Sequence, residues 1–246
     1  MPNAFKDGKN VEERLARYFD NEYLRQVPKR KVSDFLVRGL ARIKDSMTAG
    51  CAALDVGCGC GSDAIFMART GIFSSVEGVD LSRVGIDSAK KNAESVSGCD
   101  MNFKVGNFIN ADLRADYSLI FVNNVIEYIP ASDKKAFVEK MMASTKPGGI
   151  NMISFATSLP NNFVDELLDY RQMIADKLPL RLFPNSDKRK ATPLQFEQEL
   201  LEMYRNSGWS VIMSERHEGE RNFVSVQLET IIVQRPLTEN LKALRG

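Results

Sequence analysis

The 246-residue sequence has few cysteines, no long apolar run and no excess of either charge. Its four cysteines are too sparse for the disulfide framework of a small secreted protein. No stretch approaches the ~20 apolar residues that span a bilayer, and the first twenty residues lack the apolar core of a signal peptide. Lys plus Arg (33) balance Asp plus Glu (32), so no broad positive field attracts nucleic acid or an anionic membrane. These absences favour a cytoplasmic protein and argue against a membrane or a nucleic acid as its partner.

Short apolar runs alternate with amphipathic segments of helical spacing along most of the chain. Buried strands are expected at 51–56, 74–82, 101–105, 117–124 and 150–158, with a turn at 146–149. Helices are expected at 11–25, from Ser33 onward, and at 62–70, 83–96 and 131–145. This alternation predicts βαβ units, and therefore a doubly wound parallel sheet with helices on both faces.

The C-terminal part has a different pattern. Segments 208–216 and 222–235 are separated only by "HEGE", a link too short to join parallel strands. We therefore expect an antiparallel hairpin with His217 in its turn, preceded by a helix that starts after Thr192-Pro193. One domain over 1–246 then comprises a helical cap (1–48), a cofactor-binding core (50–158), a helical insertion or lid (159–191), and the final helix with the hairpin (192–246).

The stretch "LDVGCGCG" (54–61) lies where the first predicted strand ends. Its glycines are spaced G-x-G-x-G, unlike the G-x-G-x-x-G of dinucleotide-binding loops, and Asp55 precedes them. A carboxylate there disfavours a pyrophosphate and favours a ligand with positive charge. Asp80, at the tip of the second strand, suits the hydroxyls of a ribose. S-adenosylmethionine combines these features: an amino acid end, a sulfonium, a ribose and an adenine.

The motifs "ALDVGCGCG", "VEGVDLS", "VGNF", "FVNNVIEYI" and "KPGG", in this order, resemble those of class I S-adenosylmethionine-dependent methyltransferases. The resemblance implies a Rossmann-like, seven-stranded sheet that is mostly parallel and has an antiparallel last strand. It also implies three groups of contacts with S-adenosylmethionine. They are the methionine end at Asp55, Gly57, Cys58 and Gly59, the ribose and adenine at Asp80, Leu81, Asn107 and Phe108, and the sulfonium region at Asn123 and Asn124. Asn107 stands where the family often has Asp, and Tyr128 where it often has His.

No residue is assigned as the catalytic base; the candidates are His217, the single histidine, and Tyr128. Cys58 and Cys60 form a C-x-C pair, but the other two cysteines lie on or near different elements. We therefore expect small packing residues and no metal site. The aromatic residues Tyr18, Phe19 and Tyr23 either anchor the first helix or line the pocket.

The expected activity is transfer of a methyl group to an O, N or S atom of a small molecule. Two alternatives remain open: a methyltransferase that acts on protein or RNA, and a non-catalytic cofactor-binding module or a nucleotide-dependent enzyme of another type. The sequence has neither the [DN]-P-P-[YFW] motif of amino-methylating DNA enzymes nor a Pro-Cys pair for C5 methylation of cytosine.

Overall fold

The computed structural model of the chain describes residues 8–25, 31–48, 50–130, 132–156, 194–221 and 224–237. The strands are β1 (Cys51–Val56), β2 (Phe73–Asp80), β3 (Asp100–Val105), β4 (Tyr117–Asn123), β5 (Thr145–Ala156), β6 (Ser210–Arg221) and β7 (Val224–Gln234). The helices are α1 (Gly8–Arg25), α2 (Asp34–Ile43), α3 (Ser62–Arg69), α4 (Arg83–Ala93), α5 (Lys134–Ser144) and α7 (Leu194–Asn206), with short 3₁₀ turns η1 (Lys44–Ser46) and η2 (Ile126–Tyr128). Within these residues no helix is long and apolar enough to cross a membrane.

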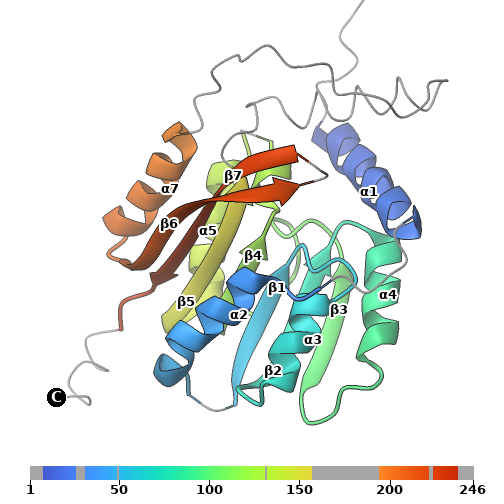
Figure 1. The fold of residues 1–246 in the computed structure, drawn as a ribbon, viewed down its shortest axis with the longest axis horizontal. Helices are drawn as coiled ribbons and strands as arrows, with labels where there is room; N and C mark the ends of the chain where they lie inside the picture. The colour runs from blue at the N-terminus through green and yellow to red at the C-terminus, as the bar shows by residue number, and fades with distance from the viewer. Residues whose placement is uncertain are drawn as a thin grey trace, which may run out of the picture.

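The strands form one sheet in the order β3-β2-β1-β4-β5-β7-β6 (Figure 1). β1 to β5 are parallel, and β7 pairs antiparallel with both β5 and β6. This confirms the predicted Rossmann-like sheet with an antiparallel C-terminal hairpin. The winding reverses between β1 and β4, and the crevice beyond the carboxyl ends of such strands is where ligands bind in open α/β sheets.

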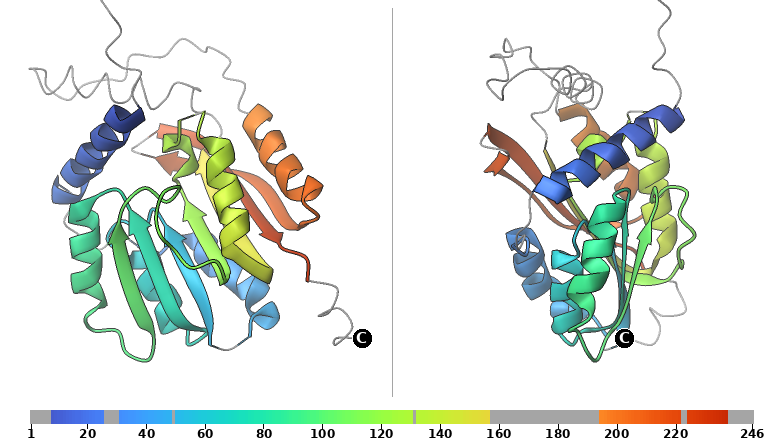
Figure 2. Two further views of the ribbon diagram at one scale, coloured as in Figure 1. Left: turned by 180° about the vertical axis from the view of Figure 1, so that it is seen from behind. Right: turned by 90° about the vertical axis from the view of Figure 1, so that its right-hand side faces the viewer.

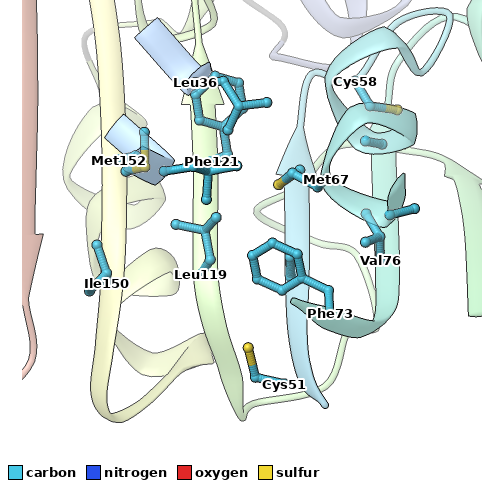
Figure 3. Packing of buried hydrophobic residues seen from close by; sticks show 14 of the residues in the cluster. Leu36, Cys51, Cys58, Met67, Phe73, Val76, Leu119, Phe121, Ile150 and Met152 are labelled. Atoms are coloured by element: carbon cyan, nitrogen blue, oxygen red, sulfur yellow. The ribbon is translucent and has the colours of Figure 1, made fainter. Parts of the chain in front are cut away.

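Helices cover both faces of the sheet (Figures 1 and 2). All six residues of β1 are buried, and alternate side chains pack toward opposite faces. Cys51 and Ala53 join a cluster with α2, α3 and α4, part of which Figure 3 shows. Leu54 and Val56 join a second cluster with α5 and α7. Burial on both faces explains why this strand reads as a continuous apolar run.

Two boundaries differ from prediction at the C-terminal strands. The segment 146–149, expected as a turn, belongs to β5, where the register with β4 shifts between Tyr117 and Leu119. Gly148 has φ of +76° there. The segment "HEGE", expected as the hairpin turn, lies inside β6, which continues to Arg221. The predicted insertion at 159–191 lies outside the described residues.

The helix α1 lies at the edge of the sheet toward which the parallel strands point (Figures 1 and 2). Leu15 is buried there and packs in a small cluster with Tyr128. The ring of Phe19 meets that of Tyr128 edge-on, with centroids 5.0 Å apart. α1 thus covers the edge where the topology places a ligand.

Candidate functional site

The glycine loop between β1 and α3 has left-handed backbone at three positions. The φ values are +74° at Gly57, +53° at Gly59 and +81° at Gly61, a region that favours glycine. The N–H groups of Gly57 and Cys58 donate to the carbonyl of Val79 at 2.8 and 3.3 Å, so the loop is attached to β2. The loop therefore presents a bare backbone in a defined conformation.

Asp80 ends β2 beside this loop and is 8% exposed. Its Oδ2 accepts from the N–H of Gly59 at 2.9 Å, and its Oδ1 accepts from the N–H of Ser82 at 2.8 Å. Each carboxylate oxygen can accept further hydrogen bonds. Asp80 therefore organises the loop and still offers acceptor capacity to hydroxyl groups of a ligand.

Asp55 lies beneath the loop and does not line the cavity that the loop borders. It is 3% exposed, and its Oδ2 has no hydrogen-bond partner among the described residues. Desolvation raises the pKa of this carboxyl well above its usual value, and the nearby Asp63 and Asp80 raise it further. The sequence predicted a contact residue. The structure places this carboxylate under the loop, where a cation bound nearby would stabilise its charged form.

A cavity of about 1330 Å³ opens at the carboxyl ends of β1, β2 and β4, between α1, α2 and β6. Eight of the ten predicted contact residues line it: Gly57, Cys58, Asp80, Leu81, Asn107, Phe108, Asn123 and Asn124. A Cβ atom at Gly59 would meet the hydroxyl of Tyr23 at 2.3 Å, so Tyr23 lies against that glycine. Pockets for one drug-sized ligand measure roughly 300–1,000 Å³. The cavity therefore has room for a cofactor and a second small molecule.

The helix α1 supplies one wall of the cavity through hydrogen bonds that the sequence did not indicate. Asp20 accepts from the Ser82 hydroxyl at 2.5 Å and from the N–H of Val84 at 3.1 Å, at the start of α4. Tyr18, Phe19 and Tyr23 line the cavity as well. The aromatic residues thus both anchor the helix and border the pocket. No sequence signal distinguishes Asp20 from the other acids of an amphipathic helix.

Asn107 and Phe108 border the cavity after β3. The Asn107 Nδ2 donates to Glu12 Oε2 on α1 at 3.0 Å, and its Oδ1 accepts from the N–H of Ile109 at 3.0 Å. Phe108 is 4% exposed and packs edge-on against Phe137 with centroids 5.0 Å apart. The amide of Asn107 is therefore oriented by two partners, one of which lies on α1.

Asn124 follows β4 with φ of +56°, and it is the one non-glycine residue with positive φ in the described part of the chain. Its N–H donates to the carbonyl of Ser154 at 2.8 Å. The turn η2 follows and places Tyr128, 8% exposed, in the cavity wall. The structure therefore brings Asn123, Asn124 and Tyr128 to one side of the cavity.

His217 also lines the cavity, although the prediction that it lies in the hairpin turn is wrong. It sits inside β6, opposite Leu228 of β7. Glycine in "HEGE" suggested a turn, but the pairing continues through this segment. The strand position keeps the imidazole at the carboxyl edge of the sheet, on the side of β5 to β7.

Cys58 behaves as a packing residue. It is 8% exposed and belongs to the cluster between the sheet and α2 to α4, where Figure 3 labels it. Burial raises the pKa of its thiol well above its usual value. Cys60 is half-buried, and its Sγ lies 3.7 Å from the hydroxyl oxygen of Ser62. The raised pKa makes the Cys58 thiol a poor nucleophile, which fits its predicted packing role.

The chain is similar to known proteins over this region. Residues 53–149 match the family described as a methyltransferase domain. Hemagglutinin 1 from Eikenella corrodens is 29% identical over 135 residues, which cover 52% of this chain and 44% of that protein. Ubiquinone biosynthesis O-methyltransferase from Rhodopseudomonas palustris is 31% identical over 106 residues, which cover 43% of this chain and 40% of that protein. The chain spans about half the length of the curated relatives it matches.

A solved structure shares the fold over nearly the whole chain. Burkholderia thailandensis 1,6-didemethyltoxoflavin-N1-methyltransferase, with 1,6-didemethyltoxoflavin and S-adenosylhomocysteine bound, matches with a TM-score of 0.63. The two chains are 17% identical, and the match covers 96% of this chain and 93% of that one. At this identity the likeness shows the fold alone.

Proposed function

The chain carries a class I S-adenosylmethionine-dependent methyltransferase domain, and we propose that it transfers a methyl group from S-adenosylmethionine to a small molecule. One observation carries the proposal. One cavity of about 1330 Å³ is lined by the glycine loop and Asp80 and also by Tyr128 and His217. The cavity lies where the winding of the sheet reverses, which is where such folds bind ligands.

The residues present fit this cofactor. The loop offers backbone without a Cβ atom at Gly57, which lines the cavity, and Asp80 retains acceptor capacity for ribose hydroxyls. The unpartnered Oδ2 of Asp55 beneath the loop suits a ligand with a positively charged end. Leu81 and Phe108 offer apolar surface for the adenine. We assign the cofactor contacts on these grounds.

The role of the chain in catalysis is positioning. S-adenosylmethionine, when bound, supplies the activated methyl group. The chain holds and orients both ligands and covers the cavity edge with α1, which excludes water from the reacting atoms. His217 and Tyr128 border the acceptor side, and either could take a proton from an O–H or N–H acceptor.

The choice of acceptor is supported by two relatives with small-molecule substrates in their names, one an O-methyltransferase and one an N-methyltransferase. These two names differ in the acceptor atom. We therefore propose a small-molecule acceptor and leave O, N or S as the atoms to be compared by experiment.

The cofactor is tested by calorimetry with S-adenosylhomocysteine and with NAD. We expect binding of the first and none of the second. Asp80→Ala removes the acceptor of the ribose hydroxyls and should weaken S-adenosylhomocysteine binding at least about tenfold. Asp87→Ala, which changes an exposed acid on α4, is the matched control and should bind like wild type. Unchanged affinity of Asp80→Ala would contradict the assignment of the cofactor site.

The activity is tested with methyl-labelled S-adenosylmethionine and three acceptor pools. The first pool contains small phenols, amines and thiols, the second contains total RNA, and the third contains unfolded protein. Label in the small-molecule pool is the expected result. Label in RNA or protein would favour the macromolecular alternative, and salt-sensitive association would accompany the RNA case. Cofactor binding without label in any pool would favour a non-catalytic module.

A further inference from the structure

We propose that Glu12 on α1 binds the exocyclic amine of the cofactor's adenine. This inference rests on the proposed function. Glu12 lies outside residues 53–149, which match the methyltransferase domain. The adenine site would then be completed by a helix far away in sequence, and the base specificity of the cavity would depend on α1.

The orientation of Asn107 is the first observation. Its amide oxygen, the group that would accept from an adenine amine, already accepts from the N–H of Ile109 at 3.0 Å. Its amide nitrogen donates to Glu12 Oε2 at 3.0 Å, across 95 positions in the sequence. The carboxylate of Glu12 therefore places a second, charged acceptor beside Asn107 at this point of the cavity.

Glu12 and Asn107 can both form further hydrogen bonds. Glu12, half-buried, lines the cavity together with Asn107 and Phe108. Its only hydrogen bond to the described residues is the one to Asn107, so its carboxylate can accept more. Asn107 Nδ2 carries a second hydrogen.

An acceptor beside a donor matches the Watson–Crick edge of adenine, which presents the 6-amine donor beside the N1 acceptor. Hypoxanthine presents a carbonyl oxygen and a ring N–H at the same edge, so both matches are reversed. Glu12 and Asn107 together should therefore distinguish adenine from hypoxanthine.

The docking of α1 does not depend on Glu12. Asp20 accepts hydrogen bonds from the Ser82 hydroxyl and the Val84 N–H, and Phe19 packs against Tyr128. The loss of the Glu12 carboxylate should therefore leave the helix in place. This independence allows a direct contact with adenine to be separated from a general effect on the cavity wall.

The test is calorimetric binding of S-adenosylhomocysteine and of its hypoxanthine counterpart, S-inosylhomocysteine. Wild type should bind the adenine compound more tightly. Glu12→Ala should lower that affinity about ten- to hundredfold, because a hydrogen bond to a charged group is lost. It should leave S-inosylhomocysteine binding unchanged or make it tighter, because the carboxylate no longer faces the carbonyl oxygen of hypoxanthine. The discrimination between the two ligands should therefore collapse.

Two control variants on the same helix complete the experiment. Glu13→Ala changes the neighbouring exposed acid and should leave both affinities as in wild type. Asp20→Ala loosens α1 and should lower both affinities by the same factor. Circular dichroism of each variant verifies the fold.

Three outcomes would overturn the inference. They are a wild type that binds both ligands equally, a Glu12→Ala variant that loses both equally, and a variant that loses neither. If wild type binds S-adenosylhomocysteine but Glu12→Ala does not reduce the discrimination between the two ligands, the proposed function stands and the role of Glu12 is refuted. If wild type binds neither compound, both proposals fail together.

Discussion

The replacement Asp55→Asn should make the protein more stable and its cofactor binding weaker. Asp55 is 3% exposed, its Oδ2 has no partner among the described residues, and Asp63 and Asp80 lie near it. An unsatisfied buried polar atom costs about 1–3 kcal/mol, and more when it is charged. Asparagine keeps the oxygen that can accept from the N–H of Ala64 and removes the charge. We therefore expect the free energy of unfolding to rise by about 1–3 kcal/mol.

The gain in stability should depend on pH with a definite sign. The pKa of Asp55 is raised in the folded protein, so between its unfolded and folded pKa values the native state binds more protons than the unfolded state. Below the unfolded pKa of about 3.9, Asp55 therefore does not lower the free energy of unfolding of wild type. As the pH rises from there toward the folded pKa, this free energy falls. Because Asp55→Asn lacks this loss, its advantage over wild type should be small near pH 4 and grow toward neutral pH.

Urea unfolding at several pH values measures this difference, and thermal unfolding provides a second readout. For a chain of this size about 1–3 kcal/mol corresponds to a rise in Tm of about 2–12 °C. S-adenosylhomocysteine carries an ammonium group at its amino acid end, and this group should stabilise the ionised Asp55. Its addition should therefore raise the Tm of wild type more than that of the variant.

The exposed Asp87→Asn on α4 is the control and should change neither stability nor binding. The reasoning would be refuted by an Asp55→Asn variant that is less stable than wild type by the same amount at every pH. It would also be refuted by unchanged affinity for S-adenosylhomocysteine.

Two further variants probe the core and the cavity wall. Tyr204→Phe removes the hydroxyl that accepts from Asn151 Nδ2 at 2.9 Å in a buried network, and should lower the free energy of unfolding by about 1–3 kcal/mol. Urea unfolding, monitored by the emission of the single tryptophan, measures this change. An unchanged unfolding midpoint would show that this hydrogen bond contributes nothing to stability. Gly59→Ala places a Cβ 2.3 Å from the Tyr23 hydroxyl and should speed trypsin cleavage within α1. Gly98→Ala, which has positive φ but open space around it, should leave that cleavage at the wild-type rate, and equal rates in all three proteins would contradict the proposed contact.

The parallel core was predictable because its information is local. β1 begins and ends where expected, and Asp80 lies at the tip of β2 as expected, since buried parallel strands read as apolar runs ending in small or acidic residues. The glycines of the loop have positive φ because the turn requires it, and this requirement is visible as residue type. The same patterns placed eight of the ten predicted contact residues around one cavity.

The edges of the hairpin were less predictable. Glycine in "HEGE" and in "KPGG" is a turn signal, yet both segments lie in strands, one in an extended β6 and one in an irregular part of β5. Pairing with the neighbouring strand outweighed the local preference there. His217 moved from a turn to a strand as a result, and it still faces the cavity.

The sequence by itself determined the winding of the sheet, the glycine loop and the acid at the tip of β2, because each depends on residues close together in the chain. Only the tertiary structure decided which groups surround the ligand. Glu12 meets Asn107 across 95 positions and Asp20 meets Ser82 across 62, and no local pattern encodes such pairs. Asp55 was visible as a carboxylate at a turn, but its burial beneath the loop beside two other acids, which governs its charge, arises only when distant strands and helices pack around it.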